Sequence, residues 1–204
     1  ENASHELQTP LAIARGKLEL LAESEDMNEE QLKELDAIYS TLGRAVKLNK
    51  ALLLLSRIEN GQYAETEDVS VDDILDELLP DLMDIYEHKQ IVLERVKGES
   101  PFIVRCNASL AHILVSNLVK NALLHNVDGG RLVVETTPSS LVIKNTGTAP
   151  LNADTLFRRF AHSVDRKKES NGLGLAISQA IASNSSLRLT YRWEEGLHVF
   201  SLVK

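Results

Sequence analysis

The sequence predicts a chain in two parts, an N-terminal α-helical hairpin and a C-terminal α+β sandwich. In the first 60 residues, apolar side chains recur at steps of three and four, as they do in bundled helices. A polar stretch, GQYAETED at 61–68, then separates this region from the rest. Beyond it, helical patterns mix with short apolar runs that are typical of strands joined mainly by hairpins. One sheet packed against one layer of helices fits this mixture.

Composition excludes several classes of protein. With 204 residues, 43% of them apolar, the chain can bury a substantial core. The net charge of −8 argues against non-specific binding to nucleic acid or to anionic membranes. Cys106 is the one cysteine, so no intramolecular disulfide forms, which fits a reducing compartment. The longest apolar run, ALLLL at 51–55, is far too short to span a membrane. Because the chain begins at Glu1, we expect a piece of a longer protein, with any membrane anchor upstream.

The N-terminal region reads as two helices. The first carries the stripe Leu7, Leu11, Ala14, Leu18 and Leu21, and an acidic segment at 22–30 interrupts it. The second runs to about Asn60 with the stripe Leu32, Leu35, Tyr39, Leu42, Val46, Asn49 and Leu53. A simple hairpin would cover these two stripes. A second row, Ile38, Leu42, Ala45, Leu52 and Leu55, widens the face and favours a four-helix bundle made from two chains.

The C-terminal region begins with a helix capped by Ser70, in which Pro80 is expected to cause a kink or a break. A second, strongly apolar helix is predicted at 109–125 and a third at 173–182. The predicted strands are IVLERV, FIVRC, RLVVETT, LVIKN, LRLTYRW and LHVFSLV. We therefore expect a hairpin domain at 1–61, a linker at 62–69 and a second domain at 70–204.

Several polar motifs interrupt these elements. Asn117 and Asn121 project from one face of an apolar helix, where they either bind neighbouring backbone or offer an oxygen ligand to Mg²⁺. NTGTAP at 145–150 follows a strand and reads as a turn. NGLGLAI at 171–177 places two glycines at a helix start, where free amides can hold an anion. Local positive charge comes from LFRRF at 156–160 and DRKKE at 165–169.

Taken in order, these motifs resemble one family over nearly the whole chain: the bacterial sensor histidine kinases. SHELQTPL at 4–11 is similar to the phosphoacceptor box and LLLLSRIENG to the end of the dimerisation hairpin. NLVKNA resembles the asparagine box, NTG the first glycine box, LFRRF the phenylalanine box and GLGLAI the second glycine box. The resemblance implies an ATP-binding domain of the Bergerat or GHKL type, which gyrase and the mismatch-repair ATPases share.

The resemblance also implies roles for individual residues. His5 would be phosphorylated by ATP, and would then pass the phosphoryl group to an aspartate in the receiver domain of a response regulator. Glu6 and Thr9 form the E-x-x-T pattern of members that also dephosphorylate the regulator. The implied nucleotide ligands are Asn121 for Mg²⁺, Asn145 and Gly147 for adenine, Gly172 and Gly174 for phosphates, with Asn117, His125 and Arg159 nearby. A homodimer, cytoplasmic and anchored in a bacterial inner membrane through an upstream segment, is the implied assembly.

The phosphoacceptor box has its own geometry. His5 lies one position off the apolar stripe, so its imidazole is expected to face outward, on the same side as Thr9. Pro10 lacks the amide that would bond the Glu6 carbonyl, and we expect it to bend the helix beside the histidine.

The chain departs from the family pattern at several positions. Asn145 replaces the usual aspartate, an uncharged acceptor that forms weaker hydrogen bonds. Ala149, Ser170 and Leu124 stand where a glycine, a glycine and a lysine are usual. These changes keep open an alternative, a degenerate adaptor that docks a partner without ATP turnover. A plain hydrolase is disfavoured, because Asn117 stands where the hydrolysing relatives carry a glutamate. The other histidines, His88, His112, His162 and His198, are interpreted as surface or capping residues.

Overall fold

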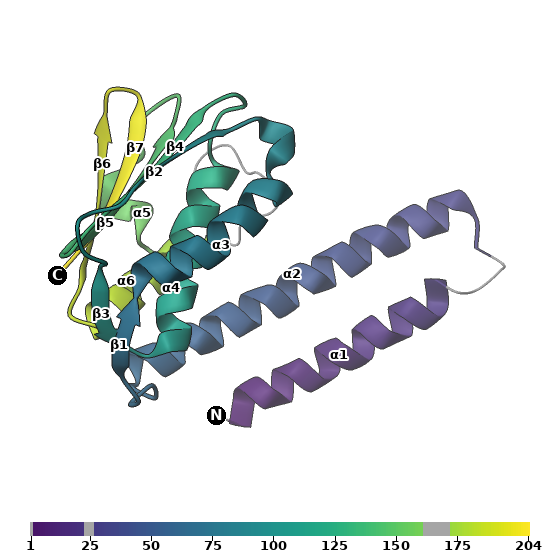
Figure 1. The fold of residues 1–204 in the computed structure, drawn as a ribbon. Helices are drawn as coiled ribbons and strands as arrows, with labels where there is room; N and C mark the ends of the chain where they lie inside the picture. Colours follow the sequence, from purple (N-terminus) through teal and green to yellow (C-terminus); the bar gives the residue numbers. More distant parts are fainter. Residues whose placement is uncertain (1, 23–26, 161–171) are drawn as a thin grey trace. The chain divides into compact units, whose positions relative to one another are not determined.

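The structure is a computed structural model that describes residues 2–22, 27–160 and 172–204, with residues 2–8 as backbone only. The chain divides into two compact units, residues 1–56 and 57–204. Figure 1 shows the helices and strands of both units. No helix in the described ranges is long and apolar enough to cross a membrane.

The first unit contains the predicted pair of helices. α1 spans Asn2–Ala22, and α2 spans Glu29–Glu59 and ends just inside the second unit. Reciprocal hydrogen bonds of 2.9 Å between Asn28 and Gln31 form a capping box that starts α2. The helix α1 continues through Pro10. Between the helices, the Tyr39 hydroxyl donates to the Glu19 carboxylate at 3.0 Å.

Apolar side chains of this unit remain exposed on the single chain. Ile38, in the second row of α2, is 53% exposed, and Leu21 of α1 is 52% exposed. Ile13, Leu20 and Leu32 are exposed as well. Exposing such a face to water costs free energy, so covering it with another apolar surface would stabilise the protein.

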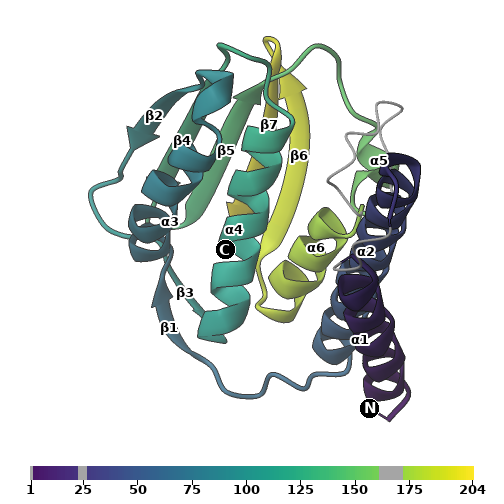
Figure 2. The same ribbon diagram turned by 90° about the vertical axis from the view of Figure 1, so that its right-hand side faces the viewer.

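The second unit is the predicted sheet with helices on one face. Its elements are β1 (Glu67–Ser70), α3 (Val71–Ile85), η1 (Glu87–Lys89), β2 (Val92–Val96), β3 (Ile103–Cys106), α4 (Ala108–Leu124), β4 (Arg131–Thr137), β5 (Ser140–Thr146), α5 (Ala153–Leu156), α6 (Gly174–Asn184), β6 (Arg188–Glu194) and β7 (Leu197–Val203). The main sheet has the order β2-β4-β5-β7-β6. β2 runs parallel to β4, and the other neighbours are antiparallel. Figure 2 shows α3, α4 and α6 side by side across one face.

The core lies between this sheet and the helices. Central α4 is buried along most of its length because its apolar residues surround the axis, and it contacts α3, α6 and β5. Strand β5 alternates buried and partly exposed residues, as a sheet with one covered face requires, whereas β7 has three consecutive buried residues at 198–200. The predicted α+β sandwich is therefore confirmed.

Two details differ from the sequence-based expectation. Residues 67–69 of the predicted linker, together with Ser70, form strand β1. This strand pairs with β3 in a small antiparallel sheet. The helix α3 continues through Pro80 without a break. The predicted cap of α3 is present, because Ser70 Oγ accepts from the Asp73 amide at 3.2 Å.

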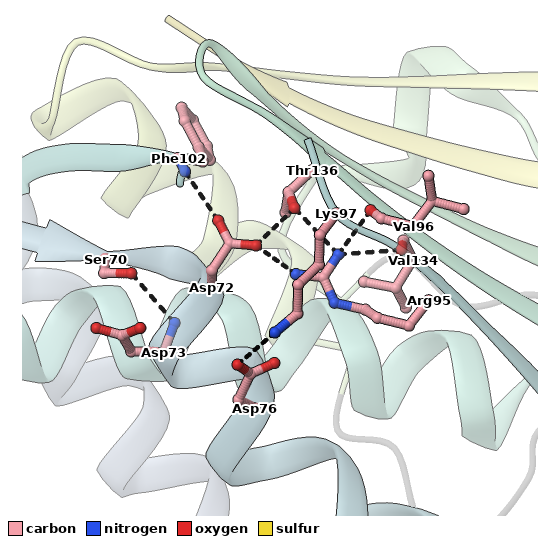
Figure 3. A network of polar contacts seen from close by, with 10 residues as sticks. All are labelled: Ser70, Asp72, Asp73, Asp76, Arg95, Val96, Lys97, Phe102, Val134 and Thr136. Atoms are coloured by element: carbon pink, nitrogen blue, oxygen red, sulfur yellow. Dashed lines mark hydrogen bonds and ion pairs between the residues drawn. The ribbon is translucent and has the colours of Figure 1, made fainter. Parts of the chain in front are cut away.

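A buried carboxylate fastens the start of α3 to the main sheet (Figure 3). Asp72 accepts hydrogen bonds from Arg95 Nη2 at 2.5 Å, from Thr136 Oγ1 at 2.6 Å and from the Phe102 amide at 2.8 Å. Burial by itself would raise the pKa of Asp72, but these hydrogen bonds outweigh it and hold the pKa below its ordinary value. The ionised carboxylate therefore joins α3, β2, β4 and the loop before β3.

Candidate functional site

The asparagine motif lies on α4, whose start is capped by Asn107. Asn117 and Asn121 are half-buried, one turn apart. Asn117 Nδ2 donates to the carbonyl of Gly174 at 3.4 Å and so links α4 to the first residue of α6. The Asn121 side chain makes no hydrogen bond to any described residue, which leaves its carbonyl oxygen available to a ligand.

The second glycine motif forms the start of α6, as predicted. Gly174 is the first residue of this helix and is exposed. Gly172 has a φ of +65°, a backbone conformation that glycine adopts without strain. Its carbonyl accepts from the amide of Phe160, at the end of LFRRF, at 3.0 Å. The phenylalanine motif and the second glycine motif are therefore brought together, whereas Ser170 and residues 166–168 lie outside the described residues.

The first glycine motif ends strand β5. Asn145 is buried, and its Nδ2 donates to the carbonyl of Thr146 at 3.1 Å, which leaves Oδ1 as a free acceptor. Asn145 pairs with His198 across β5 and β7. A Cβ added to Gly147 would lie 2.2 Å from His198 Nε2, so this position needs glycine because the imidazole occupies that space.

His198 is not the surface or capping residue that the sequence analysis expected. It is 7% exposed, and its ring lies beside the Trp193 ring with centroids 4.8 Å apart. Its Nδ1 lies 3.0 Å from the Tyr191 hydroxyl, which accepts from the Leu151 amide at 2.9 Å. Burial lowers the pKa of His198, so the imidazole is neutral at pH 7. The alternation of LHVFSLV, which places His198 on one face with Phe200 and Leu202, is the signal that could have revealed this.

Arg159 of the phenylalanine motif is engaged by an acidic partner. Its Nη2 contacts both carboxylate oxygens of Glu59, at 2.6 and 2.8 Å. Both side chains are about half exposed. Arg159 is therefore placed beside a carboxylate that competes with any phosphate for it, and sequence reasoning had missed Glu59 entirely.

A buried lysine supports the end of α4. Lys89 Nζ donates to the carbonyls of Leu123, Leu124 and Asn126 at 2.8, 2.6 and 3.2 Å. Three carbonyl acceptors satisfy the ammonium and complement the negative end of the helix dipole. His125 is the C-cap of α4 and half-buried. The positive charge at this end of α4 comes from Lys89, a residue that sequence reasoning had not singled out.

The phosphoacceptor motif lies in α1. The backbone of His5 and Glu6 is helical, and their side chains lie outside the described ones, so the outward direction of His5 stays a prediction. Thr9 is exposed. His88 is exposed and His112 half-buried, and His162 lies outside the described residues. Within the described ranges, no cluster of three His, Cys, Asp or Glu side chains could hold a metal ion.

Comparison with protein families identifies both units. Residues 1–61 match the model of the His Kinase A phosphoacceptor domain. Residues 106–202 match that of the histidine kinase-, DNA gyrase B- and HSP90-like ATPases. The two matches follow one another in the order that kinases of this kind have, and together they cover most of the chain. The chain belongs to the sensor histidine kinases. Members of this family are ATP-dependent kinases of two-component signal transduction, and the ATPase-type domain implies ATP binding.

Individual sensor kinases align over most of this chain. The phosphate regulon sensor protein PhoR of Pseudomonas aeruginosa is 31% identical over 202 residues, 92% of this chain and 45% of that protein. The heme sensor protein HssS of Staphylococcus saprophyticus is 29% identical over 190 residues, 89% of this chain and 40% of that protein. This kinase chain thus spans less than half the length of these relatives.

Solved structures show the same fold. The histidine kinase AdeS of Acinetobacter baumannii has a TM-score of 0.65 at 24% identity, covering 97% of this chain and 95% of that one. Full-length ShkA in complex with AMPPNP has a TM-score of 0.73 at 20% identity, covering 98% of this chain and 44% of that one. The predicted combination of a helical region with a GHKL-type domain is confirmed.

Proposed function

We propose that this chain transfers the γ-phosphoryl group of ATP to His5 and from there to an aspartate of a response regulator. One observation carries the proposal: a phosphoacceptor region that includes His5 and an ATPase-type region occur in one chain, in family order. The hydrogen bond between Asn117 and Gly174 supports it, because it joins the asparagine motif to the second glycine motif.

The nucleotide site is proposed to lie between α4, the end of β5 and the start of α6. Asn121 would hold Mg²⁺, because its amide offers the hard oxygen ligand that this ion prefers. Asn145 Oδ1 would accept from the adenine amino group, and Gly147 would lie beside the base. Free amides at Gly172 and Gly174 would face the phosphates. Asn117, His125 and Arg159 complete the proposed site. Bound Mg²⁺ supplies positive charge to the phosphate oxygens.

The chemical step needs little from the ATPase-type domain beyond positioning. The neutral imidazole of His5 attacks the γ-phosphorus through Nε2, the bond to the β-phosphate oxygen breaks, and ADP leaves. The Glu6 carboxylate would accept a hydrogen bond from Nδ1–H of His5. This bond would fix the tautomer that leaves Nε2 unprotonated. Asn117, an amide, cannot serve as a base for water. Transfer to histidine is therefore favoured over hydrolysis.

Assembly and location follow as proposals from the same family. We infer a homodimer in which the exposed apolar residues Ile13, Leu20 and Ile38 are covered by the second chain in a four-helix bundle. Residues 1–61 would form this hairpin, 62–69 the connection and 70–204 the ATP-binding domain. An upstream segment would anchor the cytoplasmic kinase in the inner membrane. Through Thr9, the kinase would also dephosphorylate its regulator.

The test uses the 204-residue chain with Mg²⁺ and ATP labelled at the γ-phosphate. We expect acid-labile label on the wild type and on the control His88→Ala, which changes an exposed histidine. His5→Ala should remain unlabelled. A wild type that binds ATP but acquires no label would indicate the adaptor alternative. Label that persists in His5→Ala would overturn the assignment of the phosphorylated residue.

A further inference from the structure

The imidazole of His198 lies beside the residues proposed to bind adenine, and the proposed function gives it no role. His198 lies directly opposite Asn145 on β7, in the antiparallel register of β5 and β7. Opposite residues of an antiparallel pair point to the same face, with their Cβ atoms about 5 Å apart. The two side chains are therefore neighbours on one face, and both are buried.

Hydrogen bonding defines which polar atoms remain for a ligand. The Tyr191 hydroxyl accepts from the Leu151 amide, so its own proton is left to donate to His198 Nδ1. This arrangement favours the tautomer that carries its proton on Nε2. The Asn145 amide is oriented in the same way, because Nδ2 donates to the Thr146 carbonyl and Oδ1 remains an acceptor.

The two remaining atoms are not used by the protein's own hydrogen bonds within the described ranges. Neither His198 Nε2 nor Asn145 Oδ1 has a hydrogen-bond partner among the described residues. Asn145 is 1% exposed and His198 7%, so only a small part of either side chain meets solvent. The close approach of Nε2 to the position of a Gly147 Cβ places this donor at the glycine turn itself.

We propose that His198 contributes to the recognition of adenine. Its Nε2–H donates to a ring nitrogen of adenine, while Asn145 Oδ1 accepts from the adenine amino group. This proposal rests on the proposed ATP site. Adenine presents an amino donor beside a ring-nitrogen acceptor, whereas guanine presents a carbonyl acceptor in place of the amino group. A donor beside a fixed acceptor therefore complements adenine and mismatches guanine. Together, His198 and Asn145 would select ATP over GTP more strongly than an uncharged asparagine alone.

The experiment uses the intrinsic fluorescence of Trp193, the chain's one tryptophan, whose ring lies beside His198. ATP and GTP are titrated with Mg²⁺ into the wild type, His198→Ala, His198→Gln and the control His88→Ala; calorimetry supplies the same affinities without this reporter. We expect His198→Ala to weaken ATP binding about tenfold and to narrow the preference for ATP over GTP. His198→Gln, which keeps a donor, should restore part of both. Tyr191→Phe should weaken ATP binding less than His198→Ala, because His198 keeps its Nε2 donor and loses only the hydroxyl that fixes its tautomer.

A second titration, with 1-deaza-ATP and 7-deaza-ATP, tests the proposed contact between His198 Nε2–H and a ring nitrogen of adenine. One analogue should bind the wild type about tenfold more weakly than ATP, and this loss should vanish in His198→Ala. Thermal unfolding without nucleotide separates binding from folding. If neither analogue loses affinity, or if the loss persists in His198→Ala, the proposal is overturned while the ATP site stands. A wild type that binds no ATP would instead refute the proposed function.

Discussion

Arg159 and Glu59 lie 100 residues apart in the sequence and form an ion pair through Nη2 and both carboxylate oxygens. The contact joins the end of α2 to the phenylalanine motif within the second unit. Half-exposed pairs of this kind add little stability, so the structural effect of breaking it is small. The effect of this ion pair is electrostatic, because the Glu59 carboxylate neutralises the Arg159 guanidinium that the proposed ATP site needs.

Replacing Glu59 by Gln should therefore tighten ATP binding. We expect the Kd for Mg²⁺-ATP to fall about two- to fivefold, because Arg159 is released to face phosphate. The free energy of unfolding should change by less than about 0.5 kcal/mol. Arg159→Ala should weaken binding, and the neighbouring, exposed Arg158→Ala serves as its control. Equal affinities in the wild type and Glu59→Gln would place Arg159 away from the phosphates.

The Asp72 network gives a prediction about stability (Figure 3). Asp72→Asn removes the charge opposite Arg95 and should lower the free energy of unfolding at pH 7 by about 1–3 kcal/mol. The matched control is Asp76→Asn, whose partner Lys97 lies at 2.6 Å in a half-exposed pair, so it should cost less than about 1 kcal/mol. Urea unfolding of the three proteins measures both differences.

The same carboxylate makes stability depend on pH in a defined direction. Because the pKa of Asp72 is lowered on folding, the unfolded chain binds its proton first as the pH falls. The stabilisation is fully present above the unfolded value of about 3.9 and is lost as the pH falls through the folded pKa. The difference between the wild type and Asp72→Asn should therefore shrink below about pH 4. A difference that is constant from pH 7 to pH 3 would contradict this assignment.

Gly147→Ala tests the packing of the first glycine motif. The new methyl group would meet His198 Nε2 at 2.2 Å, so we expect a loss of about 1–3 kcal/mol in stability together with weaker ATP binding. The double variant Gly147→Ala with His198→Ala should recover part of the stability, because Trp193 Cζ3 would still lie 2.9 Å from the new methyl group. Gly43→Ala, in open space within α2, should instead stabilise by about 0.5–1 kcal/mol. A double variant that recovers no stability would contradict a clash between the methyl group and the imidazole.

Thr9 separates two activities of the proposed kinase. Thr9→Ala should leave autophosphorylation of His5 unchanged and reduce dephosphorylation of the regulator about a hundredfold, because the attacking water loses the hydroxyl that orients it. Thr9→Ser keeps the hydroxyl and should retain activity. The measurement is release of phosphate from a phosphorylated receiver domain. Full phosphatase activity in Thr9→Ala would remove Thr9 from the site.

Features that depend on near neighbours in the chain were predicted well. The helices α1 and α2 follow from apolar periodicity, which only needs residues three and four apart, and α4 follows from its long, strongly apolar run. The start of α6 at Gly174 follows from its glycines, and strands β4 to β7 follow from alternation and turn residues. The strand β1 was missed because four residues of mixed polarity carry no periodic signal, and its pairing with β3 is the reason that it forms.

By itself, the sequence determined the two-part organisation, the order of the family motifs and the helical placement of the two asparagines, since all of these depend on local spacing. Tertiary structure alone decided that His198 is buried against Gly147, that Glu59 holds Arg159 and that Lys89 supports the end of α4. These contacts join residues 34 to 100 positions apart. Their partners are chosen by strand register and helix packing, which a local pattern does not encode.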